Sequence, residues 1–415
     1  MNRNIRLLTI GVAVRMLGNS LYGPFVALYL HNVLNLGYVE LGLVIVFIGA
    51  IQLPFGVVGG LVADRVRRKS LMVLGLTAEC LATFGLAYAF ATQSLILAVL
   101  AACCGGSVAS LCGPAFSAYI ADFAEGSERT RGFTYYRIGF NAGYAVGVSM
   151  GGLLISVVGF AGGVAAAATV IAVATVILYL FLDPSPRDQR LSQPLPASNL
   201  EPIVAPSRRR SFGTSLRILA RDRAALEVAV AFFLASFIAS QWAIIFPLYV
   251  HNVLGVSYSL LGIGLALNGI VVVVGQSPTT ESVLGWRHTT IAMLGIVLYG
   301  VAFVGLGAAG LWNVVPVVVF FLSVVVLTLG ENLEAIPSAT LPSNLAPKEE
   351  IGSYNGAFGA FGTLGFLLAT LAGGVVLATV TNPLLIWVVL SVPAVPAVIL
   401  LRHAAGRIPA AANRA

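Results

Sequence analysis

The sequence predicts an all-α membrane protein with twelve transmembrane helices in two parallel six-helix repeats. Of its 415 residues, 58% are hydrophobic and 9% are charged, and the mean hydropathy is +0.95. A soluble domain carries about a quarter charged residues, so this composition is not that of a soluble protein. The apolar runs repeatedly reach the ~20 residues that a helix needs to cross the hydrocarbon layer. One phrase of the sequence also occurs twice, about half a chain length apart.

Polar breaks divide each half of the chain into six apolar runs. In the first half they predict helices at 7–30, 38–62, 70–92, 94–120, 132–158 and 161–182. In the second half they predict helices at 225–250, 257–284, 289–309, 311–340, 352–378 and 381–402. The expected domains are a first half at 1–182, a cytoplasmic linker at 183–224, a second half at 225–402 and a tail at 403–415. The first run lacks the small-residue cleavage site of a signal peptide, so none is expected.

The repeated phrase is ALYLHNVLNLGY at 27–38 and PLYVHNVLGVSY at 247–258. Seven of the twelve aligned positions are identical at a constant offset of 220 residues. Each copy ends the first helix of its half and begins the second. Because six helices separate the copies, both have the same orientation in the membrane, as in transporters built from parallel repeats.

The distribution of Lys and Arg predicts the orientation, because cytoplasmic loops retain these residues. Of the 23 Lys and Arg residues, all but Arg15 and Arg137 fall on the same side as both termini, and these two lie within predicted helices. We therefore expect a multi-pass protein of the cell membrane with both termini in the cytoplasm. The net charge of +7 is scattered over separate loops, so no nucleic-acid partner is expected.

Three motifs point to a family. They are GLVADRVRRK at 60–69, NAGYAVGVSMGG at 141–152 and GENLEAIPSATLPSNLAP at 330–347. The first resembles the signature between helices two and three of the major facilitator superfamily, with Arg67 where a second Gly is usual. The second is similar to the helix-five motif of its drug and proton antiporters, with Val148 in place of Pro, and the third resembles helix ten of bacterial drug-efflux members. The resemblance covers nearly the whole chain and implies the major facilitator fold, with helices one, four, seven and ten around a central cavity.

The segment 60–69 predicts a conformational gate. Asp64 lies where a helix ends, and a carboxylate there can accept the free N–H groups at another helix N-terminus. The resemblance implies that this is helix eleven, which begins near Gly352. The basic residues of the segment could pair with Asp122, Glu125 or Glu128, and the alternative is that the cluster only fixes the topology. The expected gate residues are Gly60, Asp64, Arg65, Arg68, Lys69, Asp122 and Arg137.

Arg15 is predicted to contribute to the substrate site, because a charge near the membrane centre costs roughly 2.5–3.5 kcal/mol on insertion scales. Asn19 and Tyr22 follow it at i+4 and i+7, so the three share one helix face. The resemblance implies that this face meets substrate. The alternative is that Arg15 pairs with a neighbouring helix and locks the packing. The other residues expected to line the cavity are Asn141, Tyr144, Gln241, Trp242 and Asn268.

Glu331 and Glu334 are the predicted proton-coupling residues. They lie one turn apart in helix ten, before an expected kink at Pro337. A carboxylate that is shielded from water takes up a proton more readily. The alternative for Glu331 is a structural role as the partner of an Arg or of a helix terminus. Glu79 ranks behind this pair, because the resemblance implies that helix three is peripheral.

The sequence favours a secondary transporter that moves a small organic solute by alternating access, and not an enzyme. The apolar helices and efflux-like motifs favour proton-coupled export of amphipathic compounds by a monomer, whose partners are the lipid bilayer, the substrate and protons. The alternative is uptake or facilitated diffusion of a small organic anion, with Arg15 as its counter-ion. A membrane-embedded enzyme or a non-transporting subunit is the remaining class. No cofactor or metal is expected, because there is no GxxxxGK[ST] motif and the four Cys have no metal-ligand spacing.

Overall fold

The computed structural model describes residues 2–63, 65–123, 126–190, 221–312, 316–347 and 351–414. These residues are helical apart from the turns between helices and a single bridge between Arg287 and Arg414. Ten of the described helices are long and apolar enough to cross a membrane. Large apolar side chains on their outer faces are exposed, among them Val157 at 75% and Ile96 at 72%. Lipid accounts for this surface, because soluble proteins rarely expose so many apolar side chains.

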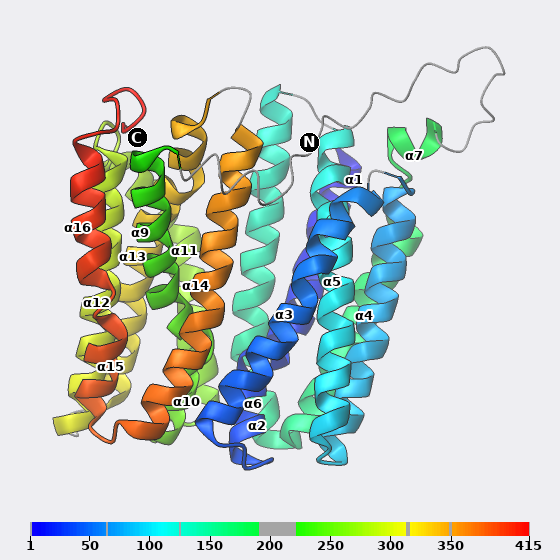
Figure 1. Ribbon diagram of the computed structural model, residues 1–415. Helices are drawn as coiled ribbons and strands as arrows, with labels where there is room; N and C mark the ends of the chain where they lie inside the picture. Colours follow the sequence, from blue (N-terminus) through cyan, green and yellow to red (C-terminus); the bar gives the residue numbers. More distant parts are fainter. Residues whose placement is uncertain are drawn as a thin grey trace. The chain divides into compact units, whose positions relative to one another are not determined.

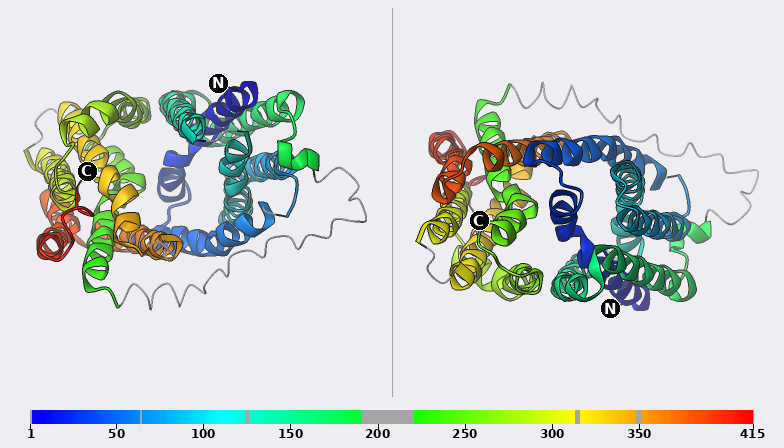
Figure 2. Two further views of the ribbon diagram at one scale, coloured as in Figure 1. Left: turned by 90° about the horizontal axis from the view of Figure 1, so that it is seen from above. Right: turned by 90° about the horizontal axis from the view of Figure 1, so that it is seen from below.

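The chain forms two compact units, and each is described by itself. Unit 1 comprises Met1–Asn199 and Ser257–Ile270, and unit 2 comprises Leu200–Val256 and Val271–Ala415. The main division lies inside the expected linker, but the short stretch Ser257–Ile270 belongs to unit 1. Within each unit the long helices run side by side (Figures 1 and 2).

Unit 1 begins with a broken helix where a continuous one was expected. The break is the 3-10 turn η1 (Gly23–Phe25), and it contains Pro24, which has no N–H to continue the helix. The expected break between helices five and six lies at Gly159, whose φ of 73° and ψ of 175° are accessible mainly to glycine. The helices are α1 (Arg3–Tyr22), α2 (Val26–Asn32), α3 (Tyr38–Ala63), α4 (Arg68–Ala91), α5 (Leu95–Phe123), α6 (Gly126–Phe181) and α7 (Pro186–Arg190).

Unit 2 differs from the expected helices in three places. The run expected at 225–250 is interrupted by the 3-10 turn η2 (Ser240–Ala243), just before Pro247, and the run at 381–402 is interrupted near Pro393. The helix expected at 311–340 continues to Leu345, through both of its prolines. The helices are α9 (Arg223–Ala239), α10 (Ile245–Asn252), α11 (Tyr258–Ser282), α12 (His288–Trp312), α13 (Pro316–Leu345), α14 (Ile351–Thr379), α15 (Pro383–Ser391) and α16 (Ala394–Ala405).

The repeated phrase folds into the same turn in both of its copies. The three backbone hydrogen bonds that close the turn measure 2.9, 3.2 and 3.1 Å in each copy. Nδ1 of His31 lies 2.7 Å from the carbonyl oxygen of Leu36, and Nδ1 of His251 lies 2.8 Å from that of Val256. A carbonyl oxygen can only accept, so Nδ1 carries the hydrogen in both. The repeat thus encodes a turn that the histidine side chain closes.

Three glycines of α6 hold α1 at close range. A Cβ atom at any of them would overlap the backbone of α1, so only glycine allows this approach. The contacts pair Gly143 with Ala13, Gly147 with Leu17 and Gly151 with Leu21. Because the contacts extend over two turns, they fix the rotation of α1, and with it the direction of its polar face.

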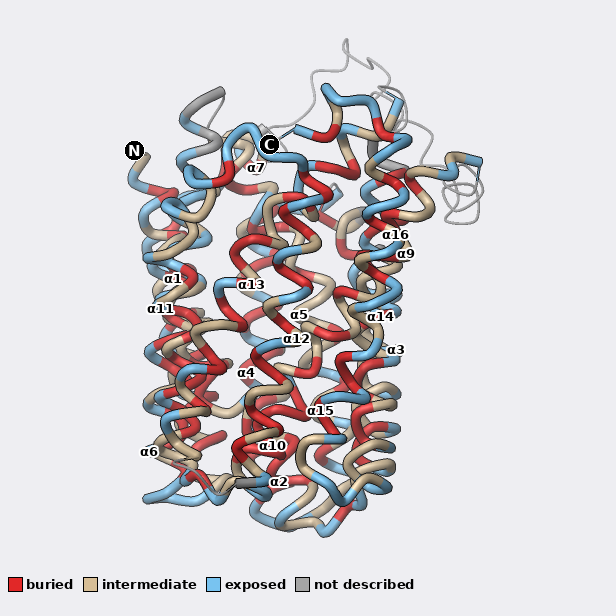
Figure 3. The backbone as a smooth tube through the Cα atoms, turned by 90° about the vertical axis from the view of Figure 1, so that its left-hand side faces the viewer, coloured by how far each residue is buried: buried red, intermediate tan, exposed pale blue. Residues whose placement is uncertain are grey.

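The core of unit 2 is aromatic. Trp387 of α15 is fully buried, and its ring stacks on Phe303 of α12 at a centroid distance of 4.7 Å. Tyr249 and Phe246 of α10 pack against the same ring at 5.2 and 6.3 Å. Buried and exposed positions therefore alternate along α12 and α15 (Figure 3), and these helices are held by packing on one face only.

Candidate functional site

The polar face of α1 meets a carboxylate of α4. Nε and Nη2 of Arg15 lie 3.0 and 2.9 Å from Oε2 of Glu79. Asn19 donates its Nδ2 hydrogen to Oε1 of the same carboxylate at 2.8 Å. Glu79 is 5% exposed, so both charges are removed from solvent. The face predicted from the spacing of Arg15 and Asn19 is therefore present, and the partner that the sequence could not supply is Glu79.

Aromatic and sulfur side chains surround this ion pair. The Arg15 guanidinium carbon lies 5.2 Å from the ring centroid of Phe116 in α5, within the range of a cation–π contact. Tyr22 lies within electrostatic range of both Glu79 and Arg15, and Tyr136 of α6 lies within range of Arg15. Phe116 and Tyr136 were not predicted from the sequence, because nothing in the periodicity of α5 or α6 distinguishes them from core aromatic residues.

The remaining candidates of unit 1 do not join the ion pair in any described contact. Asn141 donates its Nδ2 hydrogen to the Arg137 carbonyl of its own helix at 3.0 Å. Arg137 is exposed, Tyr144 is half-buried, and Asn268 of α11 is 7% exposed. Their placement in the cavity therefore stays a prediction.

Gln241 and Trp242 of η2 are packed against other helices. Gln241 is 1% exposed, and its Nε2 donates to the Ala369 carbonyl of α14 at 3.3 Å. Its Oε1 is buried without a hydrogen-bond partner among the described residues. Trp242 packs against Phe246 at 4.6 Å. A solute could reach Gln241 only if these helices separated.

The two carboxylates of α13 lie beside a close crossing with α12. A Cβ atom at Gly295 would lie 2.8 Å from the Gly330 carbonyl oxygen and 3.1 Å from Cβ of Glu334. Glu331 and Glu334 interact electrostatically with each other, and both interact with Tyr299 of α12. The glycines therefore bring the α12 backbone against the carboxylate pair.

A network of amides follows on the same helix. Asn332 is 1% exposed, and its carbonyl oxygen accepts from Nε2 of Gln276 in α11 at 3.2 Å. Asn332 also donates to the Val271 carbonyl at 3.4 Å. The side-chain oxygens of Asn332 and Gln276 are buried without a hydrogen-bond partner among the described residues. This arrangement tethers α11 to α13 beside the predicted proton-coupling residues.

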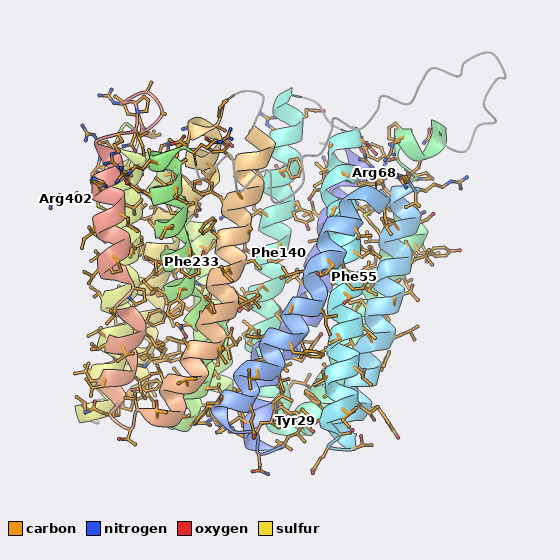
Figure 4. All side chains as sticks on the ribbon, in the orientation of Figure 1. Tyr29, Phe55, Arg68, Phe140, Phe233 and Arg402 are labelled. Atoms are coloured by element: carbon orange, nitrogen blue, oxygen red, sulfur yellow. The ribbon has the colours of Figure 1, made fainter. Side chains whose placement is uncertain are left out.

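The expected gate residues gather at one end of unit 1. Arg68 pairs with Asp122 of α5 at 2.6 Å and donates to the Ala118 carbonyl, so one of the expected pairings is present. Figure 4 shows Arg68 at the end of the unit that carries α7, opposite Tyr29. Lys69 lies over the ring of Tyr179 at 6.0 Å.

The other gate candidates make no described ion pair. Arg65 and Glu128 are exposed, and Gly60 is half-buried in the last turn of α3. Asp64 and Glu125 lie outside the described residues. The residue that sequence reasoning missed is Asp188, which accepts the backbone hydrogens of Arg68 and Lys69. It lies in a segment rich in Pro and Ser, where no periodicity could indicate a contact.

A sequence profile of the Major Facilitator Superfamily matches residues 8–370. The chain belongs to the Major Facilitator Superfamily. It is 25% identical to the MFS-type transporter YttB of Bacillus subtilis (strain 168) over 377 residues, which are 90% of this chain and 88% of that protein. It is 27% identical to the quinolone resistance protein NorA of Staphylococcus aureus over 157 residues, 38% of this chain and 39% of NorA.

Solved structures of the superfamily share the fold. A POT family transporter in complex with 5-aminolevulinic acid gives a TM-score of 0.75 at 16% identity and covers 99% of this chain and 97% of its own. A mutant of the nucleoside transporter NupG gives 0.75 at 13% identity, with 97% and 100% covered. The chain is therefore a multi-pass membrane transporter of a superfamily whose members are generally not enzymes.

Proposed function

We propose that the chain is a proton-coupled secondary transporter that exports amphipathic organic compounds by alternating access. Its layout is twelve transmembrane helices in two parallel six-helix repeats, with both termini in the cytoplasm, and it works as a monomer. In this count α1, η1 and α2 form the first span, and α6 forms the fifth and sixth. The identical turns at 27–38 and 247–258 support the parallel repeat.

The observation that carries the proposal is the carboxylate pair in the middle of α13. Glu331 lies 15 residues after Pro316 and 14 before Leu345, the two ends of the helix. At 1.5 Å per residue, it is about 22 Å from one end and about 21 Å from the other. A carboxylate at this depth can load a proton from one side and release it to the other as access alternates. Glu334 is one turn nearer the far end and is proposed as the second site.

The state of Arg15 bears on the charge of the substrate. Its guanidinium makes two contacts to the Glu79 carboxylate and a third, cation–π contact to Phe116. An anionic substrate would have to compete with a buried carboxylate for this cation, so the pairing weighs against the alternative of anion uptake. The similarity to NorA over 157 residues supports export of amphipathic compounds. Arg68, Asp122 and Asp64 are proposed as parts of the gate.

The test is flux in proteoliposomes, with the amphipathic dye ethidium as the probe and an imposed pH gradient as the driving force. Glu331→Gln mimics the protonated form, so it should abolish accumulation driven by the gradient. Exchange of dye between the two sides should remain, because exchange needs no net proton movement. Glu128→Gln, which removes an exposed carboxylate outside the span, is the control and should transport as the parent does.

Two results would contradict the proposal. If Glu331→Gln still accumulates dye against its gradient, this residue does not couple transport, and Glu334 and Glu79 become the candidates. If the parent protein moves a small organic anion such as benzoate and not the dye, the alternative function holds.

A further inference from the structure

The start of α4 is capped by a side chain that lies far from it in the sequence. Arg67 precedes the helix and makes no side-chain cap. Oδ1 of Asp188 accepts the N–H of Arg68 at 2.7 Å, and Oδ2 accepts that of Lys69 at 3.1 Å. Asp188 is 1% exposed. Free N–H groups at a helix start need such acceptors, and this carboxylate also offsets basic residues that the helix dipole disfavours there.

The start of α12 is capped in the same way from the C-terminal tail. The N–H of His288 donates to the Asn413 carbonyl at 2.8 Å, and the N–H of Thr289 donates to Oδ1 of Asn413 at 3.0 Å. Asn413 also donates its Nδ2 hydrogen to Oγ1 of Thr289 at 3.1 Å. It is 2% exposed. The next residue towards the helix, Ala412, accepts from Nδ2 of Asn344 in α13 at 3.2 Å.

These two contacts occupy equivalent places in the repeat. His288 and Thr289 follow Arg68 and Lys69 at the offset of 220 residues that relates the repeated phrase, and Arg precedes each pair. Each capping side chain comes from the segment that follows the last long helix of its half. The chemistry also matches, because a carboxylate faces the start that carries two cations, and a neutral amide faces the start that carries His and Thr.

We propose that residues 406–414 form a clasp, the counterpart in the second half of the Asp188 segment. Each clasp fixes the start of the third helix of its half to the end of the sixth. Since free helix ends fray, the two clasps keep each half rigid at its cytoplasmic end while the halves move. The statement about movement rests on the proposed function, whereas the clasp itself rests only on the contacts within each unit.

The test is hydrogen exchange measured by mass spectrometry on the full chain in nanodiscs. Asn413→Ala should accelerate exchange of the peptide that contains His288 and Thr289 by about fivefold, the usual effect of losing a helix cap. Asn413→Asp keeps an acceptor and should stay near the parent rate. The matched control is Asn382→Ala, which removes an amide cap from α15, where Asn382 accepts from Leu384 and Leu385.

The same design applies to unit 1, where Asp188→Ala should accelerate exchange at Arg68 and Lys69. Unchanged exchange in both alanine variants would overturn the clasp, and so would equal acceleration in Asn382→Ala. Faster exchange with an undiminished rate of dye exchange would overturn its role in transport. If the parent protein showed no proton-coupled flux, the proposed function would fail, while the exchange rates would still decide the clasp.

Discussion

Breaking the ion pair of α1 and α4 from one side is expected to destabilise unit 1 more than removing it entirely. Arg15→Met leaves the Glu79 carboxylate, which is 5% exposed, with Asn19 as its remaining described hydrogen-bond donor. Removing one partner of a buried pair costs about 3–5 kcal/mol, whereas replacing both by apolar residues of similar volume is often neutral. Arg15→Met with Glu79→Met should therefore recover most of the loss.

The loss is large enough to measure by thermal unfolding. About 2–4 °C per kcal/mol, the ratio for domains of 150–250 residues, gives a fall in Tm of roughly 6–20 °C for Arg15→Met. A thiol-reactive dye reports unfolding of this region, because Cys80 and Cys112 are buried close to the pair. The control is Arg3→Met, which breaks an ion pair with Asp183 whose side chains are 71% and 52% exposed. It should cost less than about 1 kcal/mol.

The double variant decides the reasoning. If the losses of Arg15→Met and Glu79→Met add in the double variant, the two side chains are not energetically coupled and the buried pair is not what stabilises the contact. If Arg15→Met melts with the parent but loses substrate affinity, Arg15 acts on substrate and the packing interpretation fails.

Two further changes test the packing of each unit. Gly147→Leu should prevent the approach of α1 to α6, because its side chain would occupy the backbone of Leu17; we expect little monodisperse protein on size-exclusion chromatography, and normal yield would contradict this contact. Trp387→Ala should cost about 3–5 kcal/mol, as for other large core aromatic residues, in thermal unfolding. Val157→Ala, at a side chain that is 75% exposed, is the control, and an equal loss there would argue against the aromatic core.

The sequence predicted what depends on local spacing. The face shared by Arg15 and Asn19 follows from helical periodicity, and the break near Gly159 follows from an apolar run too long for one span. The break before Pro247 was also readable from proline chemistry, although a continuous helix was expected. These features need no knowledge of which helices are neighbours.

The partners of these residues could not be predicted, because they depend on packing between distant segments. Glu79 was set aside since helix three was expected to be peripheral, yet close contact of α1 with α6 turns Arg15 towards α4. Asp188 and Asn413 carry no pattern of their own, because a cap needs only one acceptor at the right place. Their role became visible only when the helix starts they serve were known.

The constant offset of the repeat restricts where the chain can change length. From the repeated turn to the starts of α4 and α12, every equivalent residue is 220 positions apart, whereas Asp188 and Asn413 are 225 apart. One residue inserted into α3 would rotate everything beyond it by about 100° and turn its buried face outwards. We therefore expect insertions to be tolerated in the segments after the sixth and last spans and rejected within α3 and α11.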